Sequence, residues 1–144
     1  MKKTAIKIIA AVVLIPVAGF LLPFGAAYVY GQINLIVHKT TAEKLLDRYE
    51  AELDELVSDG DSWHKELLSL IGLKADIAYA DPASFDGAFE EIWHEGEMYL
   101  FQMPYDGSFG SWRPCGLMYR TEDGDTGIYG TRALRDGWYF FWET

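Results

Sequence analysis

The residues of this chain that could act as nucleophiles or proton carriers are one cysteine and three histidines. Cys115 lies between Pro114 and Gly116 at the start of a predicted strand. A reactive thiol needs a helix N-terminus or a neighbouring base that lowers its pKa. The sequence places neither beside Cys115, and His38 adjoins a long apolar segment. We therefore predict that Cys115 is a buried structural thiol, and we assign no catalytic residue.

Two acidic patterns have the spacing of metal ligands. Glu91 and His94 are three residues apart in a predicted helix, which would place both side chains on one face, as in di-iron bundles. Such sites need two motifs, and in the nearest second copy Asp61 serves better as a helix cap. After Asp123, an EF-hand loop would need Glu at its twelfth position, where Leu134 stands. We therefore predict no bound metal and no other cofactor. If a metal were bound, Glu91 and His94 would be its candidate ligands.

Aromatic side chains are concentrated in the second half of the chain, where 15 of the last 60 residues are Phe, Tyr or Trp. The run 138–142 places bulky rings on both faces of one strand. Core packing explains some of these rings, but a small domain cannot easily enclose all of them, and exposed Trp and Tyr mark binding surfaces. The predicted binding residues are Tyr105, Phe109 and Trp112, on a Gly-containing loop, and Trp138 and Trp142.

Charge divides the chain into two unequal parts. The first 37 residues hold three lysines and no acid, whereas residues 38–144 hold nine basic residues and all 22 acids, a formal charge of −13. Such a surface repels phosphate backbones, so we predict no nucleic-acid partner. It keeps the domain in solution and would attract a basic protein partner.

The N-terminal part contains an uncharged segment over residues 8–37. A helix of this length is long enough to cross a bilayer of about 30 Å, so the sequence predicts a transmembrane signal-anchor over residues 1–37, in contact with lipid through residues 8–30. A cleaved signal peptide is the alternative, because small residues at Gly25 and Ala27 suit a cleavage site. Small residues and prolines share one face of this helix and are predicted to pack against another helix: Pro16, Gly19, Pro23, Ala27 and Gly31.

The orientation of this segment is decided by its layout, because the Lys and Arg counts on its two sides are equal. The opening Met-Lys-Lys-Thr-Ala-Ile has the form of a bacterial export signal. The sequence therefore predicts a single-pass protein of the bacterial inner membrane, with an extracytoplasmic (periplasmic) domain over residues 38–144.

The predicted fold of this domain is α+β, with about three helices followed by a small antiparallel β-meander. A capping box at Thr40 starts a helix whose apolar stripe includes Leu46, Tyr49 and Leu53, and Asp59-Gly60 ends it. A second helix would follow Asp61 and end at Gly72. A third would run from an Asp81 cap to Gly96. The predicted strands cover residues 98–103, 115–121, 128–134 and 138–143, with tight turns between them.

Two functions are compatible with these features. The first is protein–protein interaction without catalysis, as an accessory subunit of a membrane complex or as an immunity-type protein. The second is an envelope hydrolase or glycan-binding module that uses the aromatic sheet. A pocket in which His94, Glu91 and Cys115 converge would favour the enzyme, whereas an aromatic face without such a pocket would favour binding.

Overall fold

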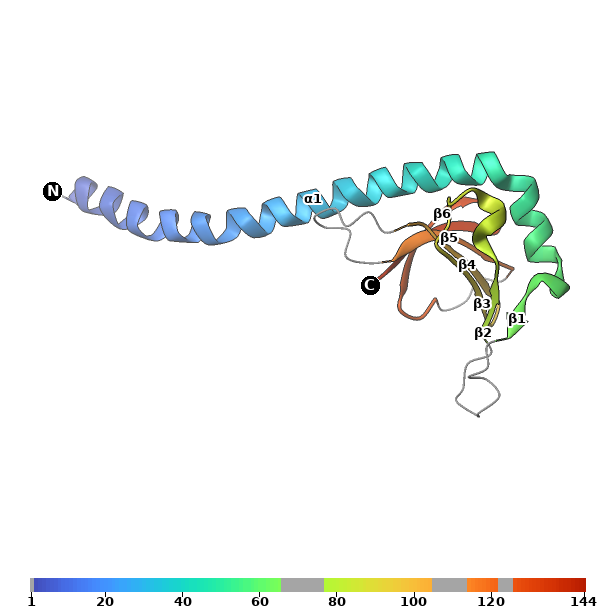
Figure 1. Cartoon of the computed structure of the whole chain (residues 1–144). Helices are drawn as coiled ribbons and strands as arrows, with labels where there is room; N and C mark the ends of the chain where they lie inside the picture. Colours follow the sequence, from blue (N-terminus) through green and yellow to red (C-terminus); the bar gives the residue numbers. More distant parts are fainter. Residues whose placement is uncertain (1, 66–76, 105–113, 122–125) are drawn as a thin grey trace.

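The chain forms one long helix followed by a coiled antiparallel sheet (Figure 1). The computed structural model describes residues 2–65, 77–104, 114–121 and 126–144. The seven described strands lie in the order β1-β2-β3-β4-β5-β7-β6, so β7 runs between β5 and β6. The elements are α1 (Lys2–Ser58), η1 (Gly60–Ser62), β1 (His64–Lys65), β2 (Ile77–Ala80), η3 (Pro82–Phe85), β3 (Glu91–Glu95), β4 (Met98–Gln102), β5 (Cys115–Arg120), β6 (Tyr129–Arg135) and β7 (Trp138–Glu143).

Helix α1 passes through the position where the sequence predicted a new start. The Thr40 hydroxyl donates to the carbonyl of Ile36 (2.9 Å), and that of Thr41 donates to Val37 (3.1 Å), so both side chains bond back along a continuous helix instead of capping one. The helix is interrupted at Tyr49, whose φ of −115° and ψ of 19° are not helical. Beyond this kink α1 turns down beside the sheet, and it ends at Ser58, where the Asp59-Gly60 signal predicted its end (Figure 1).

The main core lies between α1 and one face of the sheet. Leu46 and Leu53 of the predicted apolar stripe are buried there, together with Ala42 and Tyr49. Because successive strand residues point to opposite faces, alternate residues of three adjacent strands meet this stripe. The sheet contributes Phe101 of β4, Leu117 of β5 and Phe140 of β7, all with 0% exposed surface.

The predicted α+β arrangement with about three helices is wrong, because α1 is the only α-helix in the described part of the chain. Asp81 does act as a cap, accepting a hydrogen bond from the amide of Ala83 (2.9 Å), but the helix that it caps is the single-turn η3. Left-handed backbone at Asp86 (φ 51°) and Gly87 (φ 75°) ends η3, and β3 follows. The helix expected after Asp61 is replaced by η1 and β1, and its remainder falls outside the described residues.

The prediction of a helix up to Gly96 was wrong because the glycine that would end the helix also fits the turn of a hairpin. Gly96 has φ +58°, which suits a helix C-terminus and also a two-residue turn between antiparallel strands. Here it joins β3 to β4, with Glu95 paired to Met98. The strands from Met98 onward lie close to their predicted positions. They do not form a simple meander, because β6 lies outside β7 at the edge of the sheet.

The prediction of a transmembrane helix is also corrected. Among the described residues, no helix combines the length and apolar character needed to cross a membrane. In the part of α1 whose side chains are described, the apolar residues 21–37 are interrupted by Gln32 and Asn34 and give way to Lys39 and Glu43. A spanning helix needs about 20 consecutive, predominantly apolar residues. This finding contradicts the single-pass location in the bacterial inner membrane that was predicted from the sequence.

Gly116 of β5 provides a direct test of the sheet. A Cβ atom at this position would overlap the carbonyl oxygen of Phe101 on the neighbouring strand β4. Gly116→Ala should therefore lower the free energy of unfolding by about 1–3 kcal/mol, the usual cost of overpacking. The matched control is Gly60→Ala, because open space surrounds Gly60, and this change should stay within about 1 kcal/mol of wild type. Urea denaturation of both variants measures the difference, and equal effects would contradict the described pairing of β4 with β5.

Candidate functional site

A cleft of about 460 Å³ opens between the last turns of α1 and the hairpin that joins β6 to β7. The kink at Tyr49 brings the end of α1 to this place, and the left-handed Gly137 (φ 74°) forms the hairpin turn. The amide of Arg120 donates to the carbonyl of Gly137 (3.0 Å), which fixes the hairpin to β5. The cleft is lined by Glu50, Asp54, Val57, Ser58, Tyr119, Arg135, Asp136 and Trp138.

The cleft is acidic, because three carboxylates and one guanidinium among its lining residues give a formal charge of −2. Arg135 of β6 reaches across to α1, where its Nη1 lies 3.2 Å from Asp47 Oδ1 and its Nη2 lies 3.5 Å from Glu50 Oε1. Both acids are largely exposed, so water screens these pairs and each is worth only about 0–1 kcal/mol. The remaining charge of Asp54 and Asp136 creates a negative potential in a concave site.

The aromatic part of the cleft is built on Trp138 and Tyr119, whose ring centroids are 5.1 Å apart. Trp138 is 3% exposed, so most of its ring belongs to the core. Its indole Nε1 donates to Asp54 Oδ1 at 3.3 Å, which ties the buried ring to the acidic rim. The arrangement offers a cation the half-buried ring of Tyr119 and carboxylate oxygens, two features that bind guanidinium and ammonium groups.

The opposite face of the sheet carries a second, smaller core. Leu100, Met118 and Phe141 have 0% exposed surface, and the described side chains packed on them come from the strands themselves. The ring of Trp93 on β3 lies 6.2 Å from that of Phe141 on β7, although β4 and β5 separate these strands in the sheet. Tyr129 on β6 lies 5.4 Å from the same ring. The sheet is therefore strongly coiled, and its rings close over its own centre.

The coiling also affects the titration of Tyr129. Burial raises the pKa of Tyr129 above its ordinary value of 10.0, and the charges of Glu95 and Glu143 raise it further. Glu143 is paired with Tyr129 in the sheet, but Glu95 lies on β3, with three strands between it and β6. Because the sheet is coiled, this acid on β3 lies close enough to act on the phenol of Tyr129 on β6.

Of the predicted binding residues, the structure describes only Trp138 and Trp142. Trp138 is a core residue, and Trp142 is half-buried, with its ring 5.7 Å from that of Phe140 and directly over Gly130. The loop residues Tyr105, Phe109 and Trp112 lie outside the described residues. On the predicted helix-packing face, Pro23 and Ala27 are exposed, open space lies beside Gly19 and Gly31, and the side chain of Pro16 is outside the described set.

The candidate metal ligands and the cysteine are separated by the sheet. Glu91 and His94 lie on strand β3, where a separation of three residues places side chains on opposite faces. His94 stacks on Tyr99, with ring centroids 4.2 Å apart, and contacts Trp63. Cys115 is half-buried at the start of β5, against the main core. In the described part of the chain, no three His, Cys, Asp or Glu side chains are grouped closely enough to hold a metal ion.

The cleft could hardly be predicted from the sequence, because its residues come from three distant segments. Asp136-Gly137 is visible in the sequence only as a turn, and Glu50 and Asp54 look like ordinary solvated positions on an amphipathic helix. Their convergence depends on the kink at Tyr49, and no proline or glycine marks that position in the sequence.

Comparisons of the chain with protein-family models, with characterised proteins and with solved structures gave no match.

The raised pKa of Tyr129 predicts how the domain responds to alkali. The folded state releases this phenol proton less readily than the unfolded chain, whose pKa stays near 10. The associated stability is therefore complete below pH 10 and is lost as the pH rises through the higher folded pKa. Tyr129→Phe should remove this part of the alkaline loss, so its unfolding free energy should fall less steeply than that of wild type above pH 10. Urea titrations at several pH values measure the two slopes, and parallel slopes would contradict the burial of Tyr129.

Proposed function

We propose that the folded domain binds a basic protein partner without catalysing a reaction, and that the cleft receives an arginine or lysine side chain of that partner. The observation that supports this proposal is the cleft, a concave site with a net charge of −2 beside the rings of Trp138 and Tyr119. Its volume of about 460 Å³ falls in the range of ligand sites, roughly 300–1,000 Å³.

The contacts that such a side chain would make follow from the lining. A guanidinium pairs with carboxylates through two parallel hydrogen bonds, and Asp54 and Asp136 supply carboxylates from opposite walls. Arg135 already neutralises Glu50, so it leaves these two acids for the ligand. An arginine is the better fit of the two basic side chains, because its planar group also stacks on aromatic rings.

The charge of the whole domain supports the same kind of partner. Residues 38–144 carry a formal charge of −13, which accelerates the approach of a basic protein and disfavours an acidic one. At physiological ionic strength this attraction reaches about 8 Å, so it acts on encounter, while the cleft decides which side chain is held.

An enzymatic role receives less support from the arrangement. The expected hydrolase would need a pocket in which His94, Glu91 and Cys115 meet. Glu91 projects from the face of the sheet opposite to His94. Cys115 is paired with Trp142 on β7, and β4 separates its strand from β3.

The proposal predicts a charge-dependent interaction that a defined peptide can report. A short arginine peptide, titrated into the protein, should shift the NMR signal of the Trp138 indole N–H, which lies in the cleft beside Asp54. The same peptide with citrulline in place of arginine lacks the positive charge and should shift it much less. Asp136→Lys should weaken the arginine peptide at least about tenfold, a loss of about 1.4 kcal/mol.

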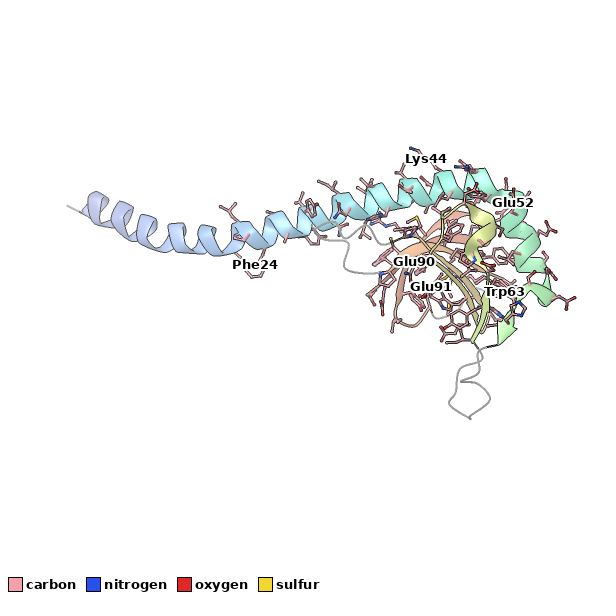
Figure 2. All side chains as sticks on the ribbon, viewed as in Figure 1. Phe24, Lys44, Glu52, Trp63, Glu90 and Glu91 are labelled. Atoms are coloured by element: carbon pink, nitrogen blue, oxygen red, sulfur yellow. The ribbon has the colours of Figure 1, made fainter. Side chains whose placement is uncertain are left out.

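The matched control is Glu52→Lys, which makes the same change of charge on α1 outside the cleft lining (Figure 2). It should leave the affinity within about twofold of wild type, because an exposed distant charge is largely screened. Equal weakening by both variants would show general charge attraction, and an unmoved Trp138 signal would show that the cleft is empty. Either result would contradict the proposal.

A further inference from the structure

The first part of α1 exposes an unusual amount of apolar surface. Nine large apolar side chains between residues 21 and 37 are 42–69% exposed, and Ile128 is the only other exposed large apolar residue of the described set. A large aromatic side chain has about 150–250 Å² of surface and a large aliphatic one somewhat less, so these nine, which surround the helix, together expose on the order of 1,000 Å². A typical monomer has no apolar patch above roughly 300–600 Å². The nine residues are Leu21, Leu22, Phe24, Tyr28, Val29, Tyr30, Ile33, Ile36 and Val37.

From this surface and the pattern within it, we infer that α1 pairs with α1 of a second copy of this chain in an antiparallel two-helix coiled coil. The inference is independent of the cleft, because it rests on residues 21–37. The seam holds four of these nine residues, so an interface of standard size, about 800 Å² from each partner, needs the whole length of α1 before the kink.

The spacing of the apolar residues defines the seam. Leu22, Ala26, Val29, Ile33 and Ile36 follow one another at alternating steps of four and three residues, the pattern of coiled-coil contact positions. The same steps continue in the sequence towards the N-terminus through Gly19, Ile15, Val12 and Ile8. A sustained seven-residue repeat of this kind favours a left-handed helix pair.

A groove lies at the centre of the seam. The surface over Gly25 and Ala26 forms a groove of about 660 Å³, walled by larger side chains that include Leu22, Val29 and Ile33. A Cβ atom at Gly25 would meet nothing within 4 Å. Small residues let two helix backbones approach closely, and the flanking side chains of a second helix would fill this groove.

The seam faces away from the sheet. Leu35, Ala42 and Leu46 pack on the main core, and at 100° per residue they lie roughly 150° around the helix from the seam. Phe24, on the side of the sheet, points in that direction in Figure 2. The helix of a second copy can therefore lie along the seam without meeting the sheet of the first copy.

Two observations favour an antiparallel arrangement of the two helices. Gly25 and Ala26 lie midway along the part of α1 between Lys2 and the kink at Tyr49, so an antiparallel pair centred there overlaps over the whole of this part, about 70 Å. In addition, a parallel pair would place two domains of charge −13 side by side, whereas an antiparallel pair places the three N-terminal lysines of one copy near the acidic domain of the other.

Disulfide formation tests the arrangement in the full-length chain, with Cys115→Ser removing the native thiol. In the antiparallel register Leu22 faces Val29 of the second copy, so a chain with Leu22→Cys and Val29→Cys should form a covalent dimer under mild oxidation. The two thiols of one chain cannot react together, because seven residues of helix separate them by about 10 Å. Each single variant should remain uncrosslinked, and so should the control pair Phe24→Cys with Tyr28→Cys, on the other side of the helix.

A covalent dimer of the Val29→Cys single variant would show parallel helices and overturn the inference. Absence of any dimer from the double variant would overturn it as well, because something other than a second copy would then cover the seam. An independent measurement is the mass in solution by sedimentation equilibrium. Leu22→Glu should raise the dimer dissociation constant at least tenfold, while Phe24→Glu, at a similarly exposed position (69% and 63%), should leave it unchanged. A monomeric wild-type chain, or equal effects of both variants, would contradict the proposal.

Discussion

The bend of α1 at Tyr49 is the constraint on which the rest of this structure depends. The Tyr49 side chain is buried, its ring meets that of Phe85 edge-on at 5.5 Å, and its hydroxyl lies 3.5 Å from Asp86 at the end of η3. Arg48 adds a cation–π contact to the Tyr49 ring (5.0 Å) and a screened ion pair to Asp86 (3.8 Å). The bend therefore joins the helix to the segment between β2 and β3. Without it α1 would leave the sheet after Leu46, and neither Leu53 nor the acidic wall of the cleft would reach its place.

The division of the chain into an apolar helical arm and an acidic domain follows from the same geometry. Before the bend, α1 extends beyond the sheet with its apolar side chains exposed, and after the bend it covers the sheet with its apolar stripe and turns its acids outward. In the described part of the chain α1 covers one face of the sheet, and on the other face the coiled sheet brings Trp93 and Tyr129 over Leu100, Met118 and Phe141. The two proposals use different parts of this plan. The cleft needs the end of α1 and the β6–β7 hairpin, whereas self-association needs only the arm.

The sequence predicted those elements whose signals have a single structural meaning. The stripe through Leu46 and Leu53, the end of α1 before Asp59 and the strands after Met98 were predictable, because spacing and turn residues agree there. Pro82 fits the start of an α-helix and of a short 3-10 helix equally well, and Gly96 fits a helix end and a hairpin; the pairing of β3 with β2 and β4 decided between them. Trp138 was predicted from its type to bind, and the side-chain alternation of β7 places most of its ring in the core, so its part in binding stays a prediction. The cleft could not be predicted from the sequence, because the kink at Tyr49 depends on long-range packing.

The most direct test of this account is a crystal structure of the full chain with an arginine peptide bound. The account predicts a bend in α1 at Tyr49 and a guanidinium within hydrogen-bond distance of Asp54 or Asp136, beside the Trp138 ring. A helix that continues straight through Tyr49, or a peptide held elsewhere on the domain while the cleft stays empty, would contradict it.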